Sequence, residues 1–440
     1  MTPNLVHFTQ MAKQNPKLRF NSLMGMLTCT DGLRASFGRQ PTGKAVGVDG
    51  VKKADYQEGL EERIEALSAS LRRLGYRPQP ARRVYIPKAN GGRRPLGIPS
   101  FEDRIVQDRL SQILQAIWEP EFRDCSHGFR PNRSAHDALR QIAKVITHGK
   151  VSWVVEADIK GFFNAVHHDH MLRFVEHRVA DPQFLRILRR FLKAGIMEDG
   201  AFMATETGTP QGGLVSPVLS NIYLHYVLDL WFEKKFRKTC HGEAHLVRYA
   251  DDFIACFAHQ ADAERFHREL SERLAQFALE VEPSKTKRLR FGRFAQQHCH
   301  KDGLERPETF TFLGFTHYVS TSRAGQFLVG RRTDTKRMRR KLLELKERLK
   351  HLRTKGGRAM TDYLRLHLLG YQQYYGVSGN SGPLRAYTRQ AAKLLFKWLN
   401  RRSQRKSITW ARFLELWRQG YIIPKPRIVH HLYPEPTRTS

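Results

Sequence analysis

Residues 246–254, Leu-Val-Arg-Tyr-Ala-Asp-Asp-Phe-Ile, decide the fold, because they place two adjacent carboxylates in a turn between apolar strands. On its own, an Asp-Asp pair usually marks no more than a solvated turn. Here apolar residues precede and follow the pair, so a hairpin over residues 246–257 would bury Asp251 and Asp252 together. Two buried carboxylates repel each other unless a cation is bound. The stretch therefore predicts a β-hairpin that carries a metal site.

A further carboxylate precedes this hairpin in the chain. An apolar run over residues 152–159, interrupted by Glu156, ends on Asp158 and predicts a strand. Transfer of a nucleotide onto a primer uses two divalent metals about 3.5–4 Å apart. Hard cations such as magnesium prefer carboxylate oxygens, and the ligands must sit on rigid backbone because small misplacements cost large rate factors. A strand end bearing Asp158 beside the hairpin of Asp251 and Asp252 meets that need.

A basic hairpin lies nearer the N-terminus. Residues 82–87 alternate as a strand, residues 89–92 (Ala-Asn-Gly-Gly) predict a turn, and residues 93–99 return. Lys88 and Arg94 lie six positions apart across this turn. Two cations aimed inward would neutralise the charge of a triphosphate leaving group. The alternative is an exposed edge hairpin with solubilising charges.

In order and spacing, the motifs between about residues 77 and 320 resemble those of group II intron-encoded reverse transcriptases, which also act as maturases. YADD at residues 249–252 is similar to the YxDD motif of reverse transcriptases. The other motifs that carry the resemblance are DIKGFF at 158–163, PQGGLVSP at 210–217, RVYIPK at 83–88 with RRPLGIP at 93–99, SHGFRP at 126–131 and FLGF at 312–315. The helical block that follows resembles the maturase-specific thumb of the same family.

The resemblance implies an RNA-directed DNA polymerase, a nucleotidyltransferase whose catalytic carboxylates are Asp158, Asp251 and Asp252. It implies that they bind two Mg²⁺ ions, with the Ile159 carbonyl as a further ligand and Mn²⁺ as a substitute metal. The partners it implies are group II intron RNA, an RNA template with a DNA primer, dNTPs and target DNA.

The resemblance also assigns residues to nucleotide binding, namely Lys88, Arg94, Phe163 and Gln211. Phe163 falls where the family places a gate against the sugar 2′-hydroxyl; without that register, a lone Phe after an apolar strand is a core residue. Lys285 matches a family lysine less distinctly, and a solvated loop charge is the alternative reading.

The fold expected is α+β: a right-hand polymerase fold, with fingers and palm that contain an antiparallel sheet, followed by an all-helical thumb or maturase lobe. The domains expected are residues 1–76, an N-terminal helical extension and template-gripping region; 77–325, fingers and palm; 326–398, the helical thumb; and 399–440, a short basic nucleic-acid-binding tail. Because no cysteine follows Cys299, the resemblance implies a compact type without the zinc-binding endonuclease domain, which should not cut its own target DNA.

Apolar periodicity predicts individual elements within this plan. Helices are expected over residues 58–74, 101–118, 171–192 and 261–278, and a strand pair over 309–319. Another helix should begin with Ser216 as its cap and Pro217 at its first position. In the thumb, basic residues flank a leucine seam on 338–352, and Tyr371, Tyr374 and Tyr375 are expected in the core rather than stacked on bases.

The overall charge points to a polyanionic partner. The chain has 75 Lys and Arg residues against 42 Asp and Glu residues, a formal charge of +33, and nucleic acid is the natural counterion. An anionic membrane is the competing partner, but no apolar run approaches the roughly 20 residues that span a bilayer. The chain does not open on a secretory signal, and its five scattered cysteines are typical of reduced thiols, so we expect a cytoplasmic protein of the bacterial cytoplasm or nucleoid.

Two histidine-rich stretches raise the question of a further metal. The triplet at residues 298–300, His-Cys-His, lacks a fourth ligand at zinc-finger spacing and favours a solvated loop. The stretch at 167–170, His-His-Asp-His, favours the cap of the helix that follows.

The function expected is copying of intron RNA into cDNA during retrohoming, together with assistance in splicing the parent group II intron. One alternative is a splicing-only, RNA-binding maturase whose polymerase site is vestigial. Another is a domesticated relative that serves DNA repair or phage defence. The intact carboxylate set favours retained synthesis.

Overall fold

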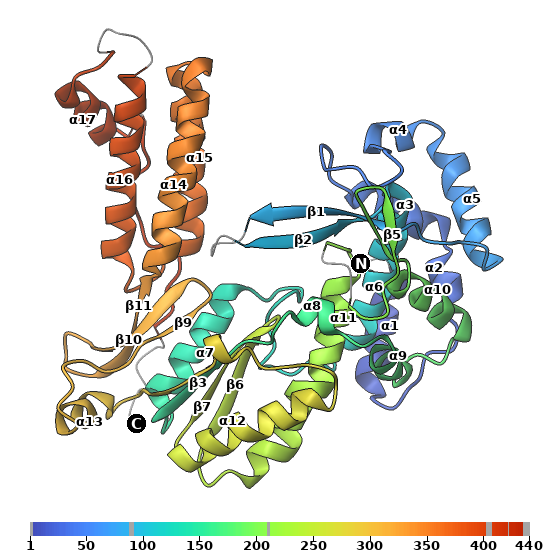
Figure 1. Ribbon diagram of the computed structural model, residues 1–440, viewed down its shortest axis with the longest axis horizontal. Coiled ribbons are helices and arrows are strands. Elements are labelled where there is room, and N and C mark those ends of the chain that lie inside the picture. Colours follow the sequence, from blue (N-terminus) through green and yellow to red (C-terminus); the bar gives the residue numbers. More distant parts are fainter. Residues whose placement is uncertain (1–2, 88–91, 209–211, 402–406, 421, 434–440) are drawn as a thin grey trace.

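The computed structural model describes residues 3–87, 92–208, 212–401, 407–420 and 422–433. Its centre is an antiparallel sheet with the strand order β6-β7-β3-β8 (Figure 1). The four strands are β3 (Trp153–Ala157), β6 (Ala244–Tyr249), β7 (Asp252–Phe257) and β8 (Lys287–Arg290). The predicted hairpin over 246–257 is confirmed, and so is the strand that ends just before Asp158.

Both faces of this sheet are buried, which explains its nearly continuous apolar strands. Successive side chains of a strand point to opposite faces. Accordingly, Phe253 and Ala255 of β7 belong to the core shared with the N-terminal lobe. Ile254 and Cys256 belong to a second core shared with the C-terminal helices. The sheet therefore joins the two lobes rather than belonging to either.

The N-terminal lobe is helical and shares the first core with the sheet. Helix α6 (Phe101–Trp118) is its centre, and the predicted helix over 101–118 is confirmed. Ser100 caps it, since its hydroxyl accepts a hydrogen bond from the Asp103 N–H at 3.3 Å. Around α6 lie α1 (Pro3–Gln14), α2 (Met24–Leu27), α3 (Thr30–Arg39), α4 (Lys53–Gln57) and α5 (Leu60–Arg72), the last within the predicted 58–74.

A four-stranded sheet of order β2-β1-β4-β5 leaves this lobe and extends toward the C-terminal helices in the view of Figure 1. Its strands are β1 (Ala81–Pro87), β2 (Arg93–Ile98), β4 (Ile196–Glu198) and β5 (Ala201–Met203). The two strands of the predicted basic hairpin are confirmed, with Ile86 paired to Arg94. The predicted turn, including Lys88, lies mostly outside the described residues.

The single helix predicted over 171–192 is wrong, because the structure has two. They are α9 (His168–Glu176) and α10 (Pro182–Leu192), preceded by α7 (Ala135–His148) and α8 (Phe162–Ala165). Pro182 starts a new helix, because it cannot donate a backbone hydrogen bond to a preceding turn. Asp181 caps that helix, accepting hydrogen bonds from the N–H groups of Gln183 and Phe184 at 3.0 Å.

The helix after residue 215 begins one position differently from the prediction. α11 (Ser216–Leu224) includes Ser216 as its first residue, and Val215 occupies the cap position. The helix then widens into π turns over η1 (His225–Asp229) and η2 (Phe232–Phe236), and ends in a 3₁₀ turn, η3 (Arg237–Thr239). α12 (Gln260–Ala275) follows and confirms the helix predicted over 261–278.

The C-terminal lobe begins with strands. β9 (Phe310–Phe312) and β10 (Phe315–Thr321) confirm the strand pair predicted over 309–319, and β11 (Phe327–Thr333) is added to them. The block expected to be helical from residue 326 is therefore wrong over its first residues, where a turn through Gly325 at φ +74° folds β11 back onto β10. The triplet 298–300 lies in a helix, α13 (Ala295–Lys301), not in the expected loop, because Cys299 is buried. In addition to η3, the chain forms the 3₁₀ turns η4 (Pro283–Lys285) and η5 (Arg353–Lys355).

Three long helices complete the lobe: α14 (Thr335–Leu352), α15 (Gly357–Tyr375) and α16 (Ser381–Leu399) (Figure 1). Leu345 and Leu349 of α14 are fully buried, as the leucine seam predicted. Tyr371 and Tyr375 are buried too, which confirms them as core residues. α17 (Trp410–Arg418) packs Phe413 against Phe396 of α16, with ring centroids 5.4 Å apart, so this part of the C-terminal segment belongs to the second core.

None of the helices within the described residues has both the length and the apolar character that crossing a membrane requires.

Candidate active site in the central sheet

The carboxylates of the site are presented by a tight turn between β6 and β7. Tyr249 pairs with Asp252 across the hairpin, which leaves Ala250 and Asp251 as the two turn residues. Ala250 has φ +57°, in the left-handed region that non-glycine residues seldom adopt. The turn therefore depends on support from surrounding segments.

The register of the sheet brings Asp158 to this turn. β3 runs antiparallel to β7, and Ala157 pairs with Phe253. The residue after β3, Asp158, therefore lies beside the residue before Phe253, which is Asp252. Ile159 continues the edge through an antiparallel bridge to Val281. The two hydrogen bonds that flank this bridge run from the Lys160 N–H to the Glu280 carbonyl and from the Glu282 N–H to the Asp158 carbonyl, so neither uses the Ile159 carbonyl.

The pKa values reflect the crowding of negative charge. Partial desolvation raises the pKa of Asp252 to about 6, and the charges of Asp251 and Asp158 add to this. Asp252 is exposed by surface area, so its desolvation comes from a recessed position rather than from full burial. The pKa of Asp251 is raised as well, first by burial and then by the charge of Asp158. Burial raises the pKa of the neighbouring Glu156 to about 7.

Positive side chains surround the carboxylates. Lys285 forms an ion pair through its Nζ with Oδ2 of Asp158. Of the two readings left open for Lys285, this contact argues against a purely solvated loop charge. Arg94 of β2 is close enough to Asp251 to oppose the rise of that pKa, as does Lys285. Arg337 at the start of α14 acts on Asp252 in the same way. The site thus receives cations from three separate parts of the chain.

The donor set suits a hard divalent cation, because carboxylates that raise one another's pKa lack positive charge. Among the described residues, however, no three His, Cys, Asp or Glu side chains are already arranged around a common metal position. The ion pair of Lys285 with Asp158 accounts for part of this, since the ammonium engages an oxygen that a metal would use. A divalent cation fits the chemistry of these carboxylate donors, and Lys285 would compete with it for Oδ2 of Asp158.

The residues predicted for nucleotide binding are only partly visible. Arg94 is exposed on β2, and its positive charge acts to lower the pKa of Asp251. Phe163 is half-buried on α8, with its ring 5.4 Å from that of the buried Phe162, so Phe162 rather than Phe163 is the core residue. Lys88 and Gln211 lie outside the described residues.

The loop that follows Gln211 approaches the basic hairpin closely. Gly212 has φ +115°, and a Cβ there would lie 2.5 Å from the Gly97 carbonyl oxygen of β2. The Leu214 N–H donates to the Gln107 side chain of α6 at 2.8 Å. A glycine is thus required where the two segments meet.

The motif at residues 126–131 supports the turn from behind, which its sequence did not reveal. The His127 N–H donates to the Arg248 carbonyl at 2.9 Å, and the Arg248 N–H donates to the Cys125 carbonyl at 2.7 Å. This segment therefore pairs with β6 through one isolated parallel bridge, between Ser126 and Arg248. A Cβ on Gly128 would lie 2.4 Å from the Ala250 nitrogen, so Gly128 permits direct contact with the turn.

A fully buried ion pair joins this support. Arg248 and Asp229 have no exposed side-chain surface, and their Nη2 and Oδ2 atoms are 2.6 Å apart. Sequence reasoning missed this pair; the only local signal was a single Arg within an apolar strand. Burial lowers the pKa of Arg248, but the charge of Asp229 outweighs it, so the pKa lies above its usual value.

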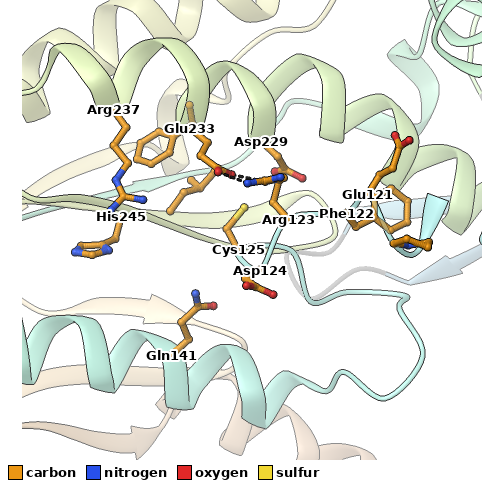
Figure 2. Close-up of a pocket in the computed structure, with 13 residues that line it drawn as sticks. Glu121, Phe122, Arg123, Asp124, Cys125, Gln141, Asp229, Glu233, Arg237 and His245 are labelled. Atoms are coloured by element: carbon orange, nitrogen blue, oxygen red, sulfur yellow. Dashed lines mark hydrogen bonds and ion pairs between the residues drawn. The ribbon is translucent and has the colours of Figure 1, made fainter. Parts of the chain in front are cut away.

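Asp229 of this pair also lines a cavity of about 450 Å³. Figure 2 shows the helix that bears Asp229, Glu233 and Arg237 on one side and Gln141 of α7 on the other. Arg123 lies beside this helix and forms an ion pair with Glu233. The lining of the cavity carries both signs of charge.

Comparison with known proteins finds similarity over part of the chain. Residues 86–317 match the family described as reverse transcriptase (RNA-dependent DNA polymerase). Protein YkfC of Escherichia coli K12 is 39% identical over 237 residues, which is 52% of this chain and 62% of that protein. The group II intron-encoded protein LtrA of Lactococcus lactis subsp. cremoris is 45% identical over 175 residues, 39% of this chain and 29% of that protein. The matches therefore span less than two thirds of either relative.

The fold has a counterpart among solved structures. A structure of telomerase from Candida albicans, in complex with a fragment of telomeric RNA, superposes with a TM-score of 0.52 and covers 84% of this chain and 63% of that one. Its sequence identity is 10%, so the likeness concerns the fold alone. The α+β polymerase fold, with an antiparallel palm sheet and a helical lobe behind it, is confirmed.

Proposed function

This chain belongs to the reverse transcriptase (RNA-dependent DNA polymerase) family and has relatives encoded by group II introns, and from that premise we propose that it is an active RNA-directed DNA polymerase. The observation that carries the proposal is the gathering of Asp158, Asp251 and Asp252 at one sheet edge, where the pKa values of Asp251 and Asp252 are raised. Carboxylates in this condition bind divalent cations at neutral pH.

Each residue has a proposed role in nucleotidyl transfer. Asp158, Asp251 and Asp252 would hold two divalent ions, Mg²⁺ or Mn²⁺, with the Ile159 carbonyl beside them. When bound, these ions supply charge neutralisation at the attacking and leaving oxygens. Arg94 would bind the triphosphate, together with Lys88, and Gln211 would lie near the incoming nucleotide.

The remaining parts would hold nucleic acid. We propose that residues 77–325 act as fingers and palm, and that residues 326–398 clamp the template and primer. Arg339, Arg348 and Lys350 are exposed on α14 beside its buried leucines, in the arrangement that phosphate contacts require. Residues 1–76 and 399–440 would add contacts to the template, in keeping with the formal charge of +33.

Similarity to intron-encoded proteins favours a particular biological setting. In that setting the enzyme copies intron RNA into cDNA during retrohoming and assists splicing of the intron that encodes it. Splicing assistance is a binding function and would survive loss of the carboxylates. A splicing-only maturase and a polymerase recruited to DNA repair or defence remain the alternatives that experiment must separate.

The test is primer extension with the full chain, a DNA primer on an RNA template and dNTPs. We expect cDNA in the presence of Mg²⁺, no product after chelation, and recovery when the metal is restored. Promotion of splicing without any cDNA, in Mg²⁺ or Mn²⁺, would contradict the polymerase and leave the maturase.

The raised pKa of Asp252 predicts a pH-dependent metal requirement. The folded-state pKa of Asp252, about 6, lies above the unfolded value of about 3.9. The ionised carboxylate therefore lowers the stability of the metal-free fold as pH rises from about 3.9 to about 6, and acidification restores that stability. Acidification should have the opposite effect on activity and reduce it, because protons compete with the metal for the carboxylate. We expect the Mg²⁺ concentration for half-maximal extension to rise up to about tenfold per pH unit below about pH 6. A flat requirement down to pH 5 would contradict the assignment of Asp252.

The position of Phe163 predicts the choice of sugar. Phe163 lies on α8, five residues after Asp158, and its side chain is half-buried. Its ring would leave no room for the 2′-hydroxyl of an incoming ribonucleotide. We expect Phe163→Val to reduce the preference for dNTPs over NTPs by about tenfold or more. Single-nucleotide incorporation with each substrate measures this ratio. The matched control is Phe162→Leu, which alters the buried neighbour and should lower thermal stability while leaving the ratio unchanged.

A further inference from the structure

Arg248 makes more contacts than a structural ion pair needs. A guanidinium has five N–H donors, and in Arg248 each has an acceptor. Nε and Nη2 donate to the two carboxylate oxygens of Asp229 at 2.8 and 2.6 Å. Nη1 donates to the Asn221 side chain at 3.1 Å and to the Ala250 carbonyl at 2.9 Å. Nη2 also donates to the Ser126 hydroxyl at 2.8 Å.

The acceptors come from three segments: the carboxylate turn, the loop that contains Ser126, and the continuous helix that contains Asn221 and Asp229. Ala250 is the strained residue of the carboxylate turn, with φ +57°. Ser126 belongs to the segment that pairs with β6, and Asn221 holds the same segment by donating to the Gly128 carbonyl at 2.7 Å. The guanidinium thus fixes the turn relative to the loop behind it and the helix beside it.

The π turn of η1 brings two of these acceptors onto one face. Asn221 and Asp229 are eight positions apart, and an ideal α-helix would rotate them by about 80°. A π turn accommodates one extra residue without additional rotation of the helix. Asn221 and Asp229 are therefore related as residues seven positions apart in an α-helix would be, by about 20°. The cap hydrogen bond from the Leu230 N–H to the His225 carbonyl closes this wide turn. The helix distortion therefore has a structural purpose at Arg248.

We propose that Arg248, held by Asp229, Asn221 and Ser126, is the positioning residue of the Ala250–Asp251 turn, and that it keeps the carboxylates aligned for metal binding. This inference rests on the proposed polymerase function for its catalytic consequence. Its structural content does not, because immobilisation of the turn can be measured in an inactive protein. Since the pair is fully buried, loss of its geometry cannot be replaced by water.

The test compares Arg248→Lys, which keeps the charge but loses the planar fork, and Ser126→Ala, which removes one acceptor. The matched control is Arg331→Lys. Arg331 is also fully buried, but its Nε and Nη2 contact no acceptor within the described residues, and it lies on β11. Five quantities are measured on the full chain: the thermal midpoint, the hydrogen exchange of the peptide over residues 244–257, the kcat and the KM of primer extension, and the affinity for Mn²⁺.

For Arg248→Lys and Ser126→Ala we expect faster exchange in that peptide, weaker Mn²⁺ binding and a kcat about tenfold or more below wild type, since small misplacements are costly. The KM for template–primer should stay within about twofold, because that surface is untouched. Arg331→Lys should lower the midpoint only. Unchanged exchange over 244–257 in both variants overturns the proposal, as does faster exchange with wild-type kcat and Mn²⁺ affinity. A wild-type protein that neither binds Mn²⁺ nor extends primers contradicts the polymerase function instead, while the exchange result still decides the positioning role.

Discussion

Asp251→Asn is expected to reduce RNA-templated primer extension by about a thousandfold or more, because the charge stabilisation supplied through a metal ligand amounts to several kcal/mol. The substitution is nearly isosteric, so the turn should keep its shape. Removal of one negative charge also removes the cost of burying that charge and the repulsion from Asp158, which together raise the pKa of Asp251. The metal-free protein should therefore unfold at the same or a higher temperature than wild type, although it is inactive.

Two measurements separate lost chemistry from lost folding. Single-turnover extension gives the rate, and the thermal midpoint with and without Mg²⁺ gives stability and metal binding together. Asp169→Asn is the matched control, because Asp169 is an exposed aspartate on α9 and should behave as wild type. Substantial extension by Asp251→Asn would contradict its role, and a lowered metal-free midpoint would contradict the repulsion between the carboxylates.

Gly128→Ala is expected to lower kcat by about a hundredfold. The substitution adds only one methyl group, at a position distant in the sequence from the three carboxylates. The new Cβ would lie 2.4 Å from the Ala250 nitrogen and 3.0 Å from the Tyr249 carbonyl carbon, both backbone atoms that cannot rotate away. The turn must shift, and a displacement of about 1 Å at a catalytic group costs a factor of this size.

The control for this variant is Gly38→Ala in α3, where an added Cβ meets nothing within 4 Å. That change should stabilise the helix slightly, by about 0.5–1 kcal/mol, with wild-type extension rates. Steady-state kinetics and the thermal midpoint of both variants decide the matter. If Gly128→Ala retains wild-type kcat, the contact between its loop and the turn has no catalytic importance.

Elements set by local patterns were predictable. The hairpin over 246–257 followed from apolar residues around a two-residue turn, and helix α6 matched residues 101–118 at both ends. Errors arose where competing local signals were ignored. The helix predicted over 171–192 contained Pro182, which starts α10, and β11 was missed before the strongly helical stretch that begins at Thr335.

The placement of the three candidate carboxylates on a strand end and a neighbouring hairpin was predictable, but the contacts around them were not. Asp158, Asp251 and Asp252 were identified from motifs, and the register of β3 with β7 places Asp158 beside Asp252. The ion pair between Lys285 and Asp158 could not be read from the chain, because it joins residues that periodicity does not relate. Lys88 and Gln211 lie outside the described residues, so their roles stay predictions.

The sequence by itself determined the carboxylate turn and the strands around it, because alternation of side chains and turn chemistry act over a few neighbouring residues. Only the tertiary structure decided what holds that turn in place. Arg248 binds acceptors at Ser126, Asn221 and Asp229, and Gly128 touches Ala250, so segments distant in the chain meet at one point. Such contacts depend on how helices and strands pack in three dimensions, and a buried arginine finds its partners only when that packing is complete.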